Sequence, residues 1–155
     1  MDNALVITDT SVLIAFERIG RLDVLPGLFP SIMAPPAVVA EFATRPQWLQ
    51  IVAVQNHALV AEHRALFLDE GEAEAIALAR EHPQATLLLD ERRGRHFALT
   101  LGLPVVGSAG ILVRARRAGL IPAVRPLLDA LLEQGFYLSE AVYRRVLEQA
   151  GEPLP

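Results

Sequence analysis

The amino-acid sequence predicts an α/β domain in which a central parallel sheet of about five strands is flanked by helices. Short apolar runs alternate along the chain with longer helical patterns, as in a sheet whose parallel strands are connected by helices. Several of these runs are apolar at successive positions, which is typical of strands that are covered on both faces. The expected strands lie at residues 5–8, 31–34, 51–54, 86–89 and 104–106.

Helical patterns follow the expected strands in order. Pro36 stands where a first helical turn tolerates proline, and Gly102, Gly119 and Gly135 fall where helices should end. The last part of the sequence, residues 122–151, predicts two amphipathic helices, which we expect to cover the sheet or a partner. The helical segments before them lie near residues 12–19, 36–43, 58–67, 70–82, 91–101 and 108–118.

Length and composition limit the classes of protein. A chain of 155 residues with 52% hydrophobic residues can build one well-packed core and is too short for two ordinary domains, so we expect residues 1–151 to form a single domain. Cysteine is absent, which excludes disulfides, thiolate metal sites and thiol nucleophiles. All 14 basic residues are arginine, which excludes mechanisms that need a lysine, such as those of P-loop proteins and phosphotransfer receivers. The sequence has no basic leader and no apolar run of about 18 residues, so we expect a cytoplasmic protein that does not enter the membrane.

Acidic residues stand directly after two of the expected strands. Asp9 follows the strand at 5–8, and Asp90 follows the strand at 86–89. Glu41 lies in the helix after the second strand, and a fourth acid comes from the segment LDEGEAEAIALA. Because ligands of a doubly wound sheet bind beyond the carboxyl ends of its strands, we expect these acids to converge at one edge.

Carboxylates that crowd together are unfavourable unless protons or a cation neutralise them. With oxygen ligands and no cysteine, the expected cation is a hard divalent metal, Mg²⁺ or Mn²⁺, and such a site suits phosphodiester hydrolysis. Each acid also has a structural explanation. Asp9 and Asp90 could cap the helices that follow them. Glu41 could pair with Arg45, and Glu72 could complete a capping box at the start of its helix.

The segment LDEGEAEAIALA offers two glutamates for the fourth acidic position. Glu72 shares a helix face with Ala75 and Ile76, which is an apolar face that should turn toward the sheet. Glu74 shares its row with Glu81 and is expected among solvent-facing charges. We therefore predict Glu72 as the metal ligand and keep Glu74 as the alternative, because the capping box would fold Glu72 back onto the backbone.

Arginines cluster near the expected acidic site. Arg92, Arg93 and Arg95 directly follow Asp90, and a second group of arginines lies on the helix at 108–118. Both groups are placed to hold phosphates, and Arg92, Arg93 and Arg95 are our candidates for nucleic-acid binding, although solvated helix faces would look the same. Aromatic residues are few, and the sequence shows no platform for base stacking.

Five segments of the chain occur in an order that carries a family resemblance: VITDTSVLIAF, APPAVVAEF, DEGEAEAIALA, LLLDERRGRHFA and VVGSAGILVRARRAGLI. Together they resemble the PIN-like domains of prokaryotes, a superfamily that includes VapC-type toxin ribonucleases, and most closely a subgroup catalogued as a domain of unknown function. The resemblance implies a three-layer α/β/α sandwich with strand order 3-2-1-4-5, an acidic metal site and cleavage of RNA. By motif, Asp9, Glu41 and Asp90 match three of the acidic positions, and Ser11 matches the small hydroxyl residue that supports the first.

Residues and resemblance together predict an endoribonuclease that depends on Mg²⁺ or Mn²⁺ and is the toxin of a toxin–antitoxin pair. The resemblance also implies a homodimer and a small antitoxin protein as partner. The alternative is a non-catalytic PIN-like module that binds RNA or a protein. Many PIN domains carry an aspartate at the third acidic position, where this chain offers glutamates, and the longer side chain changes the geometry available to a metal.

Overall fold

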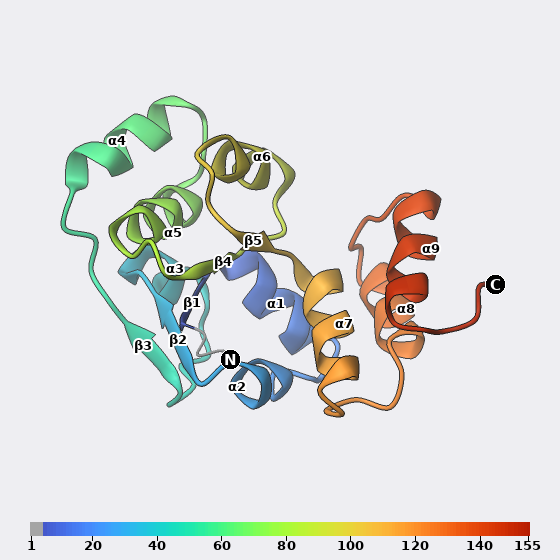
Figure 1. The fold of residues 1–155 in the computed structure, drawn as a ribbon. Helices are drawn as coiled ribbons and strands as arrows, with labels where there is room; N and C mark the ends of the chain where they lie inside the picture. Colours follow the sequence, from blue (N-terminus) through green and yellow to red (C-terminus); the bar gives the residue numbers. More distant parts are fainter. Residues whose placement is uncertain (1–4) are drawn as a thin grey trace.

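A computed structural model describes residues 5–155 of the chain, and it contains the predicted parallel sheet (Figure 1). The strands are β1 (Leu5–Thr8), β2 (Ser31–Ala34), β3 (Leu49–Ile51), β4 (Thr86–Leu88) and β5 (Val105–Val106). They are hydrogen-bonded in the order β3-β2-β1-β4-β5, and every neighbouring pair is parallel. The predicted order 3-2-1-4-5 is confirmed, and it places the carboxyl ends of β1 and β4 next to each other.

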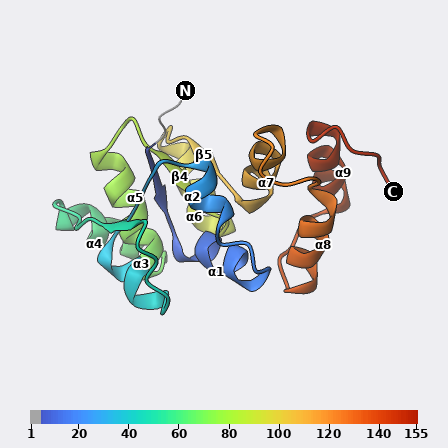
Figure 2. The same cartoon turned by 90° about the horizontal axis from the view of Figure 1, so that it is seen from below.

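Helices cover both faces of the sheet, which confirms the three-layer sandwich (Figures 1 and 2). The helices are α1 (Thr10–Arg18), α2 (Val24–Leu28), α3 (Pro36–Glu41), α4 (His57–Ala65), α5 (Glu70–Glu81), α6 (Arg92–Thr100), α7 (Ser108–Arg117), α8 (Arg125–Glu133) and α9 (Glu140–Gln149). In one layer α4 and α6 both contact α5, and in the other α1 and α2 both contact α7. The predicted helices begin and end within about two residues of these bounds, as expected for helix termini.

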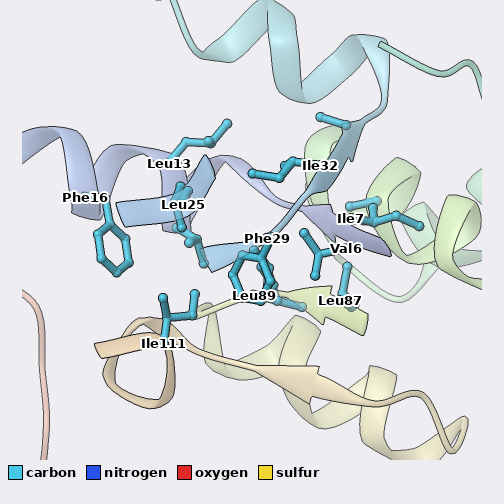
Figure 3. Packing of buried hydrophobic residues seen from close by; sticks show 14 of the residues in the cluster. Val6, Ile7, Leu13, Phe16, Leu25, Phe29, Ile32, Leu87, Leu89 and Ile111 are labelled. Atoms are coloured by element: carbon cyan, nitrogen blue, oxygen red, sulfur yellow. The ribbon is translucent and has the colours of Figure 1, made fainter. Parts of the chain in front are cut away.

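The core fixes the position of the first acidic residue. Val6 and Ile7 of β1 and Leu13 and Phe16 of α1 are completely buried, and they belong to one apolar cluster (Figure 3). Burial of a large apolar side chain contributes roughly 1.5–3 kcal/mol, so both elements are held firmly against the sheet. Asp9, the single residue between β1 and α1, is therefore held in place as well.

Two local predictions differ from the structure. The third strand was expected at 51–54, but β3 pairs Leu49 with Ile32 and Ile51 with Ala34 and then ends. As an edge strand it has only one neighbour, so its own apolar run is a poor guide: Ile51 is 50% exposed, while Val54 is buried in the loop that follows. The short helix α2 was not predicted, because its sequence VLPGL contains proline and glycine.

The two predicted amphipathic helices at the C-terminal end are present, and they pack against α7 (Figure 2). The hydroxyl of Tyr143 on α9 donates to Asp129 on α8 at 2.6 Å, which joins the two helices. After α9, Glu152 accepts hydrogen bonds from the backbone N–H groups of Val124 and Arg125 at 2.6 and 3.0 Å, which closes the unit at the start of α8. Among residues 5–155, no helix combines the length and the apolar character that crossing a membrane requires.

Candidate active site

Asp9 lies at the carboxyl end of β1 and is the N-cap of α1. Its Oδ2 accepts hydrogen bonds from the Ser11 backbone N–H at 3.4 Å and the Ser11 hydroxyl at 3.1 Å, so the capping role is confirmed. Its own N–H donates to the Leu88 carbonyl at 2.9 Å, which ties the end of β1 to β4. The side chain is only 4% exposed, and this burial raises the pKa of Asp9 to about 6 despite the hydrogen bonds that favour its charged form.

Ser11 connects the two predicted central acids. Its hydroxyl donates to Asp9 Oδ2 and accepts from the backbone N–H of Asp90 at 3.2 Å. Because one hydroxyl bridges the side chain of Asp9 and the backbone of Asp90, a change at Ser11 would alter the relative position of both acids. This is the contact expected of the supporting residue predicted from the sequence.

Asp90 follows β4, and its carboxylate binds the start of α7 and not the start of α6, the helix directly after it. Its carboxylate accepts hydrogen bonds from the backbone N–H of Ser108 at 2.7 Å and from the Ser108 hydroxyl, both at the start of α7. The alternative explanation, that Asp90 caps the helix directly after it, is not found, since Glu91 caps α6 through the N–H of Arg93 at 2.8 Å. Burial raises the pKa of Asp90, and the Ser108 bonds and nearby Arg95 only partly oppose this effect.

Glu72 forms the predicted capping box but uses only one oxygen in it. Its N–H donates to Asp69 Oδ1 at 2.8 Å, and its Oε1 accepts from the Asp69 N–H at 3.2 Å. The second oxygen, Oε2, is buried and has no hydrogen-bond partner among the described residues. Burial, with further contributions from Asp69 and Asp9, raises the pKa of Glu72 to about 7. The capping box therefore occupies only one of the two carboxylate oxygens of Glu72.

Glu74 was predicted to lie among solvent-facing charges, and this prediction is wrong. Its Oε1 accepts a hydrogen bond from the backbone N–H of Ala37 at 3.0 Å, in the first turn of α3. That N–H has no partner within its own helix, so Glu74 satisfies an otherwise free donor. The role of Glu74 in the structure is to hold α3 against α5.

Glu41 ends α3 and is exposed. Its Oε1 accepts from the Thr10 hydroxyl at 3.3 Å, and no ion pair with Arg45 is found within residues 5–155. Partial burial of the carboxylate and the charge of Asp69 raise the pKa of Glu41. Any side chain at Gly71 would collide with Glu41 Oε1, so the glycine is needed for this approach.

Two more glycines leave room for the acids. A Cβ atom at Gly94 would lie 2.9 Å from Glu72 Oε2, and one at Gly107 would lie 2.8 Å from Asp90 Oδ1. Both glycines stand at positions where a side chain would displace a carboxylate. Sequence reasoning missed them, and it also missed Ser108, whose hydroxyl at a helix start after the last strand was the available signal.

Two of the candidate acids, Glu72 and Asp90, each line a hollow. A hollow of about 640 Å³ is lined by Asp69 and Glu72 on one side and by Arg92 and Arg93 on the other. A groove of about 1090 Å³ begins at Asp90 and runs between α7 and α9, with residues 135–139 before α9 also in its lining. The groove is rich in positive charge, and its arginines are Arg92, Arg95, Arg114, Arg117 and Arg145. Since Arg92 lines both, the hollow and the groove adjoin.

Asp9 and Asp90 are brought together through Ser11, and the negative charge of Asp9 contributes to the raised pKa of Glu72. Glu41 joins the same region through Thr10. In the described part of the chain no three acidic or histidine side chains are arranged as a ready-made metal-binding group. The donors that are present are nonetheless all oxygens, and the orphaned Oε2 of Glu72 is a buried polar atom of the kind that a bound cation satisfies.

Comparison with known proteins agrees with the fold. The family model described as "DUF3368: PIN domain" matches residues 5–152. No curated protein and no solved structure matches the chain. PIN domains have a nuclease-like fold and typically use divalent metals, and the strand order found here fits them. Because the match covers almost all of the chain, this protein belongs to the PIN domain family DUF3368.

Proposed function

We propose that this protein is a metal-dependent endoribonuclease that hydrolyses phosphodiester bonds of RNA. The observation that carries the proposal is the arrangement of Asp9 and Asp90 at the ends of neighbouring strands, bridged by Ser11. Glu72 is near enough for the charge of Asp9 to raise its pKa, and its Oε2 has no hydrogen-bond partner within residues 5–155. Raised pKa values at all three carboxyl groups show that their negative charges are poorly compensated by the protein itself.

Asp9, Asp90 and Glu72 are the residues that would hold Mg²⁺ or Mn²⁺, with Glu41 at the edge of the set. When bound, the divalent ion would supply Lewis-acid stabilisation of the phosphate and an activated water. The side chains of Ser11 and Ser108 orient Asp9 and Asp90, so these two carboxylates need little reorganisation. Arg95 lies beside Asp90 and lines the groove, where it is placed to bind a phosphate oxygen.

The direct test is RNA cleavage by the purified protein with Mg²⁺, with Mn²⁺ and with EDTA. We expect cleavage with either metal and none in EDTA. RNA binding without cleavage under any of these conditions would favour the alternative, a non-catalytic PIN-like module. Failure to bind RNA at all, with tight binding to a protein, would favour the protein-binding form of that alternative.

The groove arginines provide a second prediction. Arg114 and Arg145 are exposed, line the groove, and pair with no acidic side chain among residues 5–155. Arg145→Ala should weaken RNA binding about tenfold and lower the slope of log Kd against log salt by about one, because one phosphate contact is lost. Arg144→Ala is the matched control, since Arg144 is exposed on the same helix and does not line the groove. Equal effects of the two substitutions would show that only net charge matters.

Toxicity and assembly extend the proposal. The resemblance to VapC-type toxins supports a homodimer that pairs with a small antitoxin protein and blocks growth when expressed alone. We expect a dimer mass by light scattering at about tens of micromolar, the range in which weak protein interfaces form. A monomer mass at that concentration would contradict the dimer, and normal growth of cells that express the active protein alone would contradict the toxin role.

A further inference from the structure

Phe67 combines an exposed aromatic ring with an unusual backbone conformation. Its side chain is 83% exposed, the highest value among the large apolar residues described. Its backbone φ is 66°, and within residues 5–155 it is the one residue other than glycine with a positive φ. This left-handed conformation is unfavourable for a bulky residue, and an exposed ring gains little packing to compensate for it.

The turn between α4 and α5 explains the backbone of Phe67 but not its ring. The Phe67 N–H donates to the Arg64 carbonyl at 3.0 Å, which ends α4, and Asp69 then caps α5. A left-handed residue is common directly after a helix, and glycine is the usual choice there because it avoids the strain. Leu68, the next residue, is buried and anchors the turn in the core. The phenyl ring of Phe67 is therefore an addition that the turn does not need.

The surroundings of Phe67 indicate what the ring contacts. It lines the hollow of about 640 Å³ that also contains Glu72 and the arginines Arg92 and Arg93. The Phe67 carbonyl accepts a long hydrogen bond of 3.5 Å from Arg93 Nη1, which connects the turn to α6. An exposed aromatic ring beside arginines, next to acidic residues, is suited to a nucleotide, because the ring stacks on a base while the arginines bind phosphate.

We propose that Phe67 stacks on a base of the RNA and so places the adjacent phosphate over the acidic site. This inference rests on the proposed function. It adds the residue that sets the register of the RNA strand relative to the acidic site. RNA is favoured over a protein partner because a protein that covered this hollow would have to desolvate the exposed arginines Arg92 and Arg93. A nucleotide instead places its phosphate against the arginines and the face of its base against the Phe67 ring.

The test compares three variants by fluorescence anisotropy with a labelled single-stranded RNA of about 12 nucleotides in EDTA, which prevents cleavage. Phe67→Gly removes the ring and also relieves the strained φ, so it should weaken RNA binding about 5- to 100-fold without lowering Tm. Phe67→Trp restores an aromatic face and should bind within about twofold of wild type. Leu66→Ala is the matched control: Leu66 is the exposed neighbour at 46% exposure, and its loss should leave binding unchanged.

Three results would overturn the inference. Wild-type RNA affinity in Phe67→Gly would show that the ring does not contact RNA. Equal weakening in Leu66→Ala would show a general effect of the turn. A changed mass in light scattering with unchanged RNA binding would assign Phe67 to a protein interface. If RNA binding depends on Phe67 but no metal supports cleavage, the stacking role stands and the proposed hydrolysis fails.

Discussion

Asp9→Asn and Asp90→Asn should each abolish metal-dependent RNA cleavage while leaving a folded protein. Each substitution removes the negative charge and keeps the shape of the side chain. At position 9 one asparagine oxygen can accept both bonds from Ser11, because both go to the same oxygen of Asp9. At position 90 the asparagine oxygen can accept the bond from the Ser108 N–H, and the asparagine NH₂ group can donate to the Ser108 hydroxyl oxygen. The loss of cleavage should be about 1000-fold or more, because ligand charge at a metal site contributes several kcal/mol to transition-state stabilisation.

The measurement is the initial rate of RNA cleavage in Mg²⁺ or Mn²⁺, with Tm recorded for every variant. Asp23→Asn is the control, because Asp23 is an exposed acid whose carboxylate, within the described residues, is hydrogen-bonded to Arg21 alone, at 3.1 and 3.3 Å. It should cleave at the wild-type rate. Cleavage at wild-type rates by both Asp9→Asn and Asp90→Asn would show that the acidic site has been assigned to the wrong residues.

Glu72→Gln should remove metal binding, whereas Glu74→Gln should retain it. Glutamine is a normal partner in a capping box, so the substitution at Glu72 keeps the hydrogen bond from the Asp69 N–H and changes only the charge at Oε2. Glutamine can likewise accept the bond from the Ala37 N–H in Glu74→Gln. The two variants therefore differ mainly in whether a buried charge near Asp9 is lost.

The pH dependence of the free energy of unfolding also distinguishes a metal-binding role of Glu72 from a capping role alone. The pKa of Glu72 is raised from 4.5 to about 7, so between these values the folded state binds more protons than the unfolded state. The stability contributed by protonated Glu72 is complete below pH 4.5 and is lost as the pH rises through about 7. In EDTA, the free energy of unfolding of Glu72→Gln relative to wild type should therefore rise by on the order of 2–3 kcal/mol between pH 5 and pH 8.

Urea unfolding at the two pH values measures this difference, and Mn²⁺ titration measures the metal affinity. At pH 8, added Mn²⁺ should raise the Tm of wild type and of Glu74→Gln but not of Glu72→Gln. Loss of Mn²⁺ affinity in Glu74→Gln alone would show that the other glutamate is the ligand. Lower stability of Glu72→Gln at both pH values, with Mn²⁺ affinity intact, would make Glu72 a capping residue only.

The local pattern of apolar and polar residues was sufficient to predict most of the fold. The apolar runs of β1 and β4 are buried on both faces, so their position was visible in the sequence, and the acids that follow them were visible for the same reason. The edge strand β3 was misplaced because an edge has one neighbour, and its register is set by pairing with β2. The helix α2 was missed because burial of Val24 and Leu25 outweighs the unfavourable proline and glycine beside them.

The hydrogen-bond partners of the acidic side chains could not be predicted from the local sequence pattern. The sequence offered capping of the next helix as the structural alternative for Asp90, but its carboxylate reaches Ser108, 18 residues further along the chain. Glu74 was expected in solvent and binds the N–H of Ala37, 37 residues away. Both contacts depend on which helices meet once the sheet has formed, and helical periodicity reports only the face of a residue, not the neighbour opposite that face.

The sequence by itself determined the α/β class, the alternation of strands and helices, and the identity of Asp9 and Asp90 as acids beyond neighbouring strands. These features follow from local periodicity and from the rule that parallel strands end at one edge. Only the tertiary structure decided that Oε2 of Glu72 has no hydrogen-bond partner in the described part of the chain, that glycines leave room for the carboxylates, and that Phe67 stands exposed beside Arg93. Such properties depend on distances between segments that are remote in the chain, and the packing of the whole core sets those distances.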